Sequence, residues 1–165
     1  MTALSSSALA GALLADGPAG QLGEAPLYGF LAGSWDAQVR IHRPGEEVRL
    51  ARGEIHAGWV LAGRALQDVW ILPGVFHGTT LRLHDPGLDA WRIHWLDPVL
   101  QSYPRMIGRA EGADVVQLGE NADGAQMRWS FHDIRPDSFH WRAEISPDGE
   151  AWRLQVEFLA RRQQS

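Results

Sequence analysis

Asp97 and Asp68 are the carboxylates whose positions suit them best to acid–base chemistry. Asp97 ends a segment in which every second residue is apolar, and Asp68 alternates with bulky apolar residues. A carboxylate that shares a face with apolar side chains is partly removed from water, and it can act as a general acid or base. The alternative interpretation is that Asp97-Pro98 caps a turn. With an arginine assigned to each carboxylate, the candidate catalytic residues are Asp97, Arg109, Asp68 and Arg64.

Tryptophan is the most conspicuous residue type, with eight copies in 165 residues. Indole rings are large, rigid and apolar, so a set of them on one face of a sheet fills a core or lines a pocket for a flat ligand. The pattern leaves open which face of the segment around Gln67 turns inward. The predicted ligand-binding residues are Trp35, Gln67, Trp70, Trp91, Trp95, Tyr103, Trp129, Phe131 and Trp141.

Seven histidines raise the question of a metal site. Four of them fall on the polar sides of their segments, and no pair has the spacing His-x-His or His-Glu-x-x-His. The chain contains no cysteine, which excludes disulfides, thiol nucleophiles and cysteine-ligated metals within it. All 15 basic residues are arginine, which excludes Schiff-base chemistry on a lysine. We therefore predict no metal and no cofactor, with His42, His94, His132 and His140 facing solvent.

Short alternating segments, which must position these residues, fill the chain from Leu27 onward. Apolar and polar residues alternate within each segment, and Gly, Pro, Asp and Asn separate the segments at intervals of about 8–12 residues. In the last segment Trp152, Leu154, Val156 and Phe158 share one face. The pattern predicts about ten strands, near 35–41, 48–59, 64–72, 79–84, 91–97, 103–109, 114–119, 127–132, 139–145 and 152–162.

A sheet of so many strands leaves two unpaired edges unless it closes on itself. Closure into an antiparallel up-and-down barrel removes both edges, and short sequential hairpins favour it over the long crossings of a sandwich. The apolar face then lies inside, where a barrel of this size also encloses a cavity. We therefore predict an all-β fold: a closed antiparallel up-and-down barrel over residues 27–162.

Residues 1–26 differ from the rest in being small and free of arginine. Ser5 to Ser7 can cap a short helix over Ala8 to Ala15, which Gly17-Pro18 would end, so we predict a loosely held arm. The segment has neither the basic start nor the long apolar run of a secretory signal, and a cytoplasmic location is expected. A mean hydropathy of −0.22 argues against a membrane partner, and a pI near 5.8 argues against nucleic acid. A homodimer is left open.

Several strings of the sequence resemble the calycin barrels, the lipocalin and fatty-acid-binding superfamily. Gly33-Ser34-Trp35 is similar to the Gly-x-Trp motif that opens their first strand, where the Trp plugs one end of the barrel. The strings 58–70, 85–92 and 128–139 resemble a bacterial calycin-like domain family of unknown function. The resemblance covers most of the chain and implies a barrel with an internal ligand cavity. It carries over no catalytic residue.

Three functions remain as hypotheses. The first is binding of a small, largely hydrophobic or aromatic molecule in a Trp-lined cavity. The second is a cofactor-independent enzyme, such as an isomerase, cyclase or lyase, that uses Asp97 with Arg109 or Asp68 with Arg64. The third is haem binding through a histidine, as in the nitrobindin-like calycins. This chain departs from that branch's extended Gly-x-Trp-x-Gly-x-Gly motif after Trp35.

Overall fold

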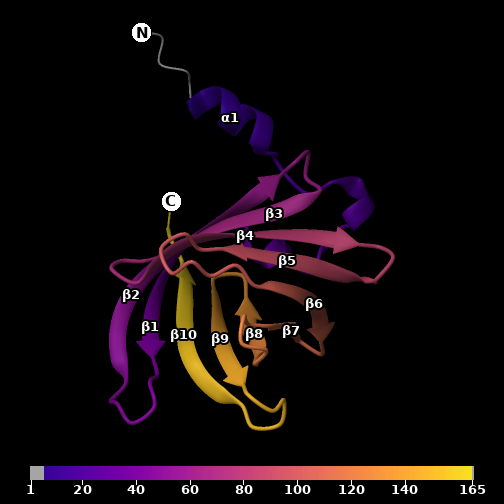
Figure 1. Cartoon of the computed structure of the whole chain (residues 1–165). Helices are drawn as coiled ribbons and strands as arrows, with labels where there is room; N and C mark the ends of the chain where they lie inside the picture. Colours follow the sequence, from indigo (N-terminus) through magenta and orange to yellow (C-terminus); the bar gives the residue numbers. More distant parts are fainter. Residues whose placement is uncertain (1–5, 165) are drawn as a thin grey trace.

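Ten antiparallel strands form the wall of a closed barrel in the computed structural model, which describes residues 6–164 (Figure 1). Each strand pairs with its neighbours in sequence, and β1 pairs with β10 to close the wall. The predicted closed up-and-down barrel is confirmed. The strands are β1 Gly33–Ile41, β2 Arg49–Val60, β3 Ala65–Leu72, β4 Phe76–Asp85, β5 Ala90–Leu96, β6 Arg105–Glu111, β7 Asp114–Glu120, β8 Gln126–Arg135, β9 Ser138–Ser146 and β10 Arg153–Arg162.

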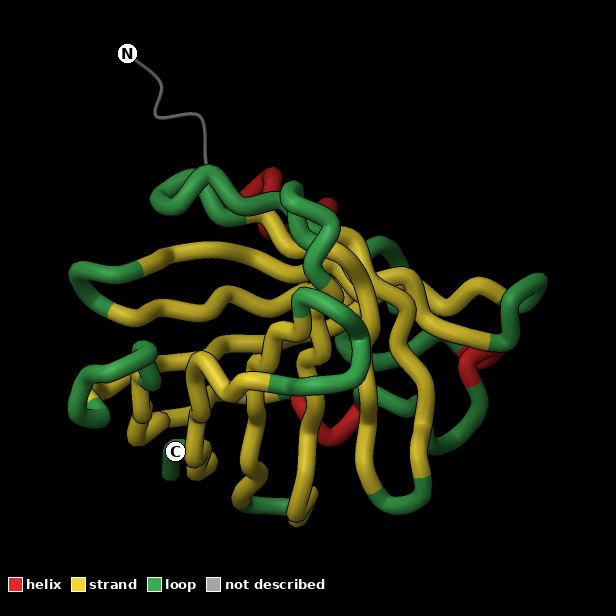
Figure 2. The backbone as a smooth tube through the Cα atoms, turned by 60° about the horizontal axis from the view of Figure 1, so that its bottom comes forward, coloured by secondary structure: helices red, strands yellow, loops and turns green. Residues whose placement is uncertain are grey.

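The alternation of β1 shows why these segments form strands. Trp35, Ala37, Val39 and Ile41 are buried, while the residues between them are exposed. Since successive side chains of a strand point to opposite faces, this pattern places one face in the core and the other in water. Figure 2 shows that strands make up almost all of the wall and that the helical segments are short.

A bulge in β10 changes the face of its first residues. The pairing with β9 shifts between Leu154 and Val156, so Leu154 lies opposite Glu144, which faces outward, whereas Val156 lies opposite the buried Ala143. An extra residue in one strand reverses the alternation beyond it. The prediction that Trp152 and Leu154 share the face of Val156 and Phe158 is therefore wrong. Trp152 lies outside the barrel, where the guanidinium of Arg128 stacks on its ring at 4.1 Å.

One end of the barrel is closed by the chain that leads into β1. The short helical turn η2, Gly29–Leu31, brings its last carbonyl to Trp35, whose Nε1 donates to the Leu31 oxygen at 2.9 Å. The guanidinium of Arg162 lies 4.1 Å from the Trp35 ring centroid and donates to the carbonyls of Phe30 and Ala32. Trp35 is fully buried in this plug.

Gly33 is the residue that makes this plug sterically feasible. Its φ of +128° is unfavourable for residues with a side chain, and a Cβ there would overlap Arg162. The first residue of the Gly-x-Trp motif is thus glycine because of its backbone conformation and because Arg162 occupies the space that a side chain would need.

The N-terminal arm contains α1, Ser6–Leu13, and the turn η1, Gly20–Leu22. The predicted helix is present two residues earlier than expected, and Ser5 of its predicted cap lies outside the described residues. The chain after α1 is held more firmly than predicted, because Ala15 N donates to Trp59 O and Ala19 N to Gly63 O, both at 2.9 Å. Figure 1 shows α1 projecting from the barrel. No helix in the described part of the chain is long and apolar enough to cross a membrane.

Candidate functional site

A cavity of about 380 Å³ lies inside the barrel. Its lining reaches the hairpins at the end opposite the plug, and two of the lining residues there are open to solvent: Leu100 is 57% exposed, and the side chain of Arg43 is 60% exposed. The cavity therefore opens at this end, which we call the mouth. Its volume falls within the range of small-molecule sites, about 300–1,000 Å³.

Four tryptophans form a continuous aromatic wall in the cavity. Their ring centroids follow one another at 4.9 Å from Trp70 to Trp141, 5.7 Å from Trp141 to Trp129 and 6.1 Å from Trp129 to Trp95. They come from β3, β9, β8 and β5, and each lies on the inward face of its strand. Such a wall offers broad apolar contact and several π faces to a flat ligand.

Gly78 makes room for the last indole of this wall. A Cβ at Gly78 would lie 2.5 Å from the six-membered part of the Trp95 ring. Phe76, on the same strand, packs edge-on against Trp95 with the ring centroids 5.9 Å apart. The absence of a side chain at Gly78 thus lets Trp95 lie close against β4.

A buried ion pair lies at the polar floor of the cavity, where Arg82 belongs to the lining and Asp68 lies behind it. Arg82 is 2% exposed and Asp68 is 1% exposed, and Arg82 Nη1 donates to Asp68 Oδ2. The other carboxylate oxygen of Asp68 accepts a hydrogen bond from the backbone N–H of Thr80 at 3.1 Å. A buried charge without a partner is strongly destabilising, so each of these two residues compensates the charge of the other.

Gln117 and Tyr28 complete the floor behind the ion pair. Gln117 Oε1 accepts hydrogen bonds from the Tyr28 hydroxyl at 3.0 Å and from Arg82 Nε at 3.4 Å. The Arg82 guanidinium also lies over the Tyr28 ring, 5.1 Å from its centroid. Burial raises the pKa of the Tyr28 hydroxyl, and the positive charge of Arg82 opposes part of that rise. Tyr28 therefore stays neutral and acts as a hydrogen-bond donor.

Asp97 lies at the mouth and is 1% exposed. Its Oδ1 accepts hydrogen bonds from the backbone N–H groups of Val99 at 2.9 Å and Leu100 at 3.1 Å, as the turn-cap interpretation predicts. Its Oδ2 is buried and has no hydrogen-bond partner among the described residues. Asp97 therefore caps the β5–β6 turn with one oxygen and keeps the other unused.

Two buried donors in the interior also have no partner within residues 6–164. They are Trp70 Nε1, on a residue of the aromatic wall, and Gln117 Nε2, on a residue that lies behind Arg82 and does not itself line the cavity. A buried polar group without a hydrogen bond costs about 1–3 kcal/mol. Polar atoms of this kind indicate where water or a polar ligand atom would be stabilised.

The structure does not bring together the acid–base pairs expected from the sequence. Arg109 is exposed and donates to the carbonyl of Leu88, away from Asp97. Arg64 is exposed in the turn between β2 and β3, and Asp68 pairs with Arg82 instead.

Sequence reasoning missed Arg82 because the alternation of β4 is misleading. Leu81 and Leu83 face outward, while the polar residues Thr80 and Arg82 face inward. The available signal was Asp68 on the neighbouring strand, since an inward carboxylate needs a cation within reach.

The predicted ligand-binding residues occupy three places. Trp35, Trp91 and Phe131 are buried but do not line the cavity, because they pack in the core toward the closed end. Gln67 faces outward and donates to Thr79 Oγ1, and Tyr103 is 52% exposed. Those that line the cavity are Trp70, Trp95, Trp129 and Trp141.

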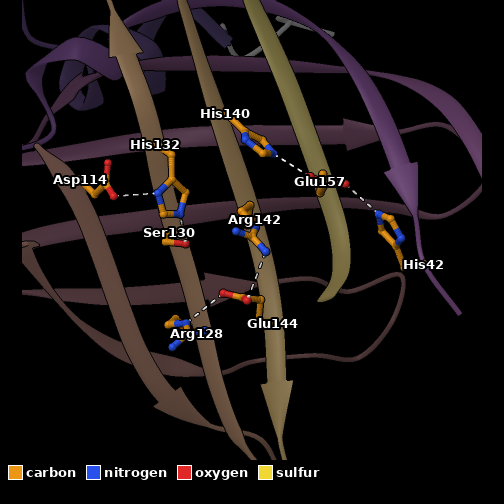
Figure 3. A network of polar contacts seen from close by, with 9 residues as sticks. All are labelled: His42, Asp114, Arg128, Ser130, His132, His140, Arg142, Glu144 and Glu157. Carbon is orange, nitrogen blue, oxygen red and sulfur yellow. Dashed lines mark hydrogen bonds and ion pairs between the residues drawn. The ribbon is translucent and has the colours of Figure 1, made fainter. Parts of the chain in front are cut away.

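The outer face of the barrel carries a separate set of polar contacts (Figure 3). Glu157 on β10 lies between two histidines, with His42 Nε2 and His140 Nε2 each 2.8 Å from one of its oxygens. Burial alone would raise the pKa of Glu157, but the hydrogen bonds from the two histidines lower it below its usual value. This cluster holds β1, β10 and β9 together.

Neighbouring contacts extend the set over β9, β8 and β7. Glu144 binds Arg128 at 2.9 Å and Arg142 at 3.5 Å, while His132 lies 2.8 Å from Asp114 and 2.7 Å from the Ser130 hydroxyl. Within residues 6–164, no group of three or more His, Asp or Glu side chains could hold a metal ion. These contacts stabilise the outer face and lie away from the cavity.

Two solved structures are similar to this barrel. Rv2717c from M. tuberculosis matches with a TM-score of 0.60 at 12% identity, over 89% of this chain and 99% of that chain. The S-type phycobiliprotein lyase CPES from Guillardia theta matches with a TM-score of 0.58 at 14% identity, over 82% of this chain and 90% of that chain. No family model and no curated protein sequence matches the chain. The fold is therefore that of a calycin-like barrel, as the sequence resemblance implies.

Proposed function

We propose that this protein binds a small, largely apolar or aromatic molecule inside the barrel. The observation that carries the proposal is the cavity of about 380 Å³, which is open at the mouth and walled by four indoles. A core built only for stability would fill such a space with side chains, because protein interiors are close-packed. Retained space with an aromatic wall and a few polar atoms is typical of ligand sites.

The polar floor supports the same proposal. Asp68 and Arg82 neutralise one another, and they are held by Thr80, Gln117 and Tyr28. These contacts hold the polar side chains of the floor in fixed orientations. The side chains need not rearrange when a ligand binds, so less conformational entropy is lost on binding.

An enzyme that works in the same cavity is the alternative. One of the similar structures, CPES, is named a lyase, so this fold is compatible with catalysis. Asp97 would be the acid–base group, because its Oδ2 is buried at the mouth with no partner among residues 6–164. The expected arginine partners lie elsewhere, so binding stands ahead of catalysis.

Haem binding is the second alternative. Among the described residues that line the cavity there is no histidine. The cavity, as lined by these residues, therefore offers no histidine ligand for haem.

Titration with the neutral fluorescent probe N-phenyl-1-naphthylamine tests the proposal. We expect saturable binding, with energy transfer from tryptophan to the probe. Trp95→Ala should weaken it about tenfold or more, because Trp95 belongs to the cavity wall. His140→Ala should leave it unchanged, because His140 lies on the outer face. Equal effects of the two substitutions would contradict the proposed site.

A further inference from the structure

We infer that the ligand carries a cationic nitrogen, as in an organic amine, which pairs with Asp97 Oδ2 at the mouth of the cavity. This inference rests on the proposed function and specifies the class of molecule that the cavity takes. Three observations carry it: the unused oxygen of Asp97, the charge balance of the lining and the aromatic wall.

The unused oxygen of Asp97 is best judged against a second Asp-Pro turn in the same chain. Asp85 precedes Pro86 as Asp97 precedes Pro98, and its Oδ1 likewise accepts two backbone N–H groups, from Gly87 at 2.9 Å and Leu88 at 3.3 Å. The Oδ2 of Asp85 accepts a hydrogen bond from Arg92 Nε at 2.7 Å. The Oδ2 of Asp97 has no such cation within the described chain, although Asp97 is the more deeply buried of the two. At the first turn the fold thus supplies Arg92 as the cation for Asp85 Oδ2. At the second turn no described side chain takes the equivalent place beside Asp97 Oδ2.

The charge balance of the lining favours a cation from outside. Of the described residues that line the cavity, Asp97 is the only carboxylate, and Arg43 and Arg82 are the only cations. Arg82 is neutralised by Asp68, and the side chain of Arg43 is 60% exposed and lies 3.9 Å from Glu46. The charge that stays uncompensated inside is therefore negative, and a buried charge is stabilised most by a partner of opposite sign.

The aromatic wall also suits a cation. The faces of indole rings carry partial negative charge, and tryptophan is the strongest of the aromatic residues in cation–π attraction. Four such rings line the same cavity as Asp97, and cages of this kind recognise organic ammonium groups. An ammonium ion on an apolar skeleton would satisfy the carboxylate, the rings and the apolar surface together.

Three probes on one skeleton test the charge preference: 2-naphthylmethylammonium, neutral 2-naphthylmethanol and anionic 2-naphthoate. Calorimetric titration of the full chain should give the tightest binding for the ammonium probe, about tenfold over the alcohol, and the weakest for the carboxylate. Asp97→Asn should remove the preference for the ammonium probe, because the amide keeps the oxygen that caps the turn but has no charge. Asp85→Asn is the matched control and should leave the ranking unchanged, because that carboxylate lies outside the cavity lining.

The outcomes separate this inference from the proposed function. Alcohol binding as tight as ammonium binding to the wild-type chain would overturn the inference and leave the proposed function standing, and this comparison does not depend on any variant folding. A preference that survives in folded Asp97→Asn would overturn the assignment to Asp97. Failure of all three probes to bind would contradict the proposed function itself.

Discussion

The pairing of Asp68 with Arg82 places an ion pair in a barrel interior that is otherwise mostly apolar. Arg82 is fixed on four sides, by Asp68, by Gln117 and by the rings of Tyr28 and Phe131, whose centroids lie 5.1 and 5.8 Å from its Cζ. These contacts hold the guanidinium at the floor of the cavity. The pair therefore defines where the cavity ends and the packed core begins.

Removing one member of this pair should destabilise the protein severely. Arg82→Met leaves the Asp68 carboxylate buried without its cation, and we expect a loss of about 3–5 kcal/mol in the free energy of unfolding. Urea denaturation measures the loss. The double variant Asp68→Leu/Arg82→Met should recover most of it, because neither charge remains. A double variant that loses as much as the sum of the two single variants would contradict this account of the floor.

Individual residues of the site were only partly predictable from the sequence. Trp95, Trp129 and Trp141 could be assigned to the interior because each lies on the more apolar face of its strand. For Trp70 the sequence leaves the face open, because Asp68 shares its face and Gln67 lies on the other. Arg82 could not, because the apolar face of β4 turns outward, where Leu81 and Leu83 are only partly exposed. The two-residue period of a strand shows which residues share a face. It shows which face points into the barrel only when the two faces differ clearly in polarity.

At the scale of elements, the plug at the closed end depends on the backbone of Gly33. Gly33→Ala should cost about 2–3 kcal/mol in unfolding free energy, because its φ of +128° is strained for alanine and Arg162 must leave Trp35 to make room. Gly45→Ala is the control, with a φ of +74° and open surroundings, and it should cost about 1 kcal/mol. Thermal and urea denaturation measure both. Equal costs would show that contact with Arg162 adds nothing.

The strands were predictable to within a few residues, but their irregularities were not. Turn residues such as Ser146-Pro147-Asp148-Gly149 mark the hairpins in the sequence. The bulge between Leu154 and Val156 leaves no comparable mark, because an extra residue in a strand looks like an ordinary step of the alternation. For that reason the alternation predicts the wrong face for Trp152, which directly precedes β10.

At the scale of the whole molecule, contacts on the outer face join the strands at which the barrel closes. Glu157 on β10 binds His42, just beyond β1, and His140 on β9, so one carboxylate links the first strand of the barrel to its last two. The contacts of Glu157 therefore stabilise the pairing of β1 with β10 from the outer face of the barrel, and the plug at Trp35 stabilises the barrel from inside.

The stability of the barrel should depend on pH through Glu157. The pKa of Glu157 is lower in the folded state than its usual value of 4.5, so the folded state binds fewer protons than the unfolded one. The stabilisation is complete above that value and is lost as the pH falls through the lower, folded pKa. Glu157→Gln should cost about 1 kcal/mol at neutral pH. The difference from wild type should shrink in acid, as urea denaturation over a pH series measures, and a constant difference would contradict this role.

Closure of the barrel was predictable because it follows from the whole chain rather than from any one residue. Ten strands in sequential hairpins leave two edges that must be removed, and pairing β1 with β10 removes both. The cavity was expected from the size of the barrel, from its tryptophans and from the resemblance to calycins. Its polar floor and its mouth arise from pairs of residues far apart in sequence, such as Tyr28 and Gln117, which no local pattern connects.

A cavity-filling substitution tests most directly whether the interior is the binding site. Ala143 lines the cavity on β9, and Ala143→Phe should occupy the space that a ligand needs. We expect the variant to keep or raise the melting temperature of the wild type, because it fills a void, while its affinity for N-phenyl-1-naphthylamine falls about tenfold or more. Leu118→Phe, on the exposed face of β7, is the control and should bind as the wild type does. Undiminished probe binding by a folded Ala143→Phe variant would contradict the account.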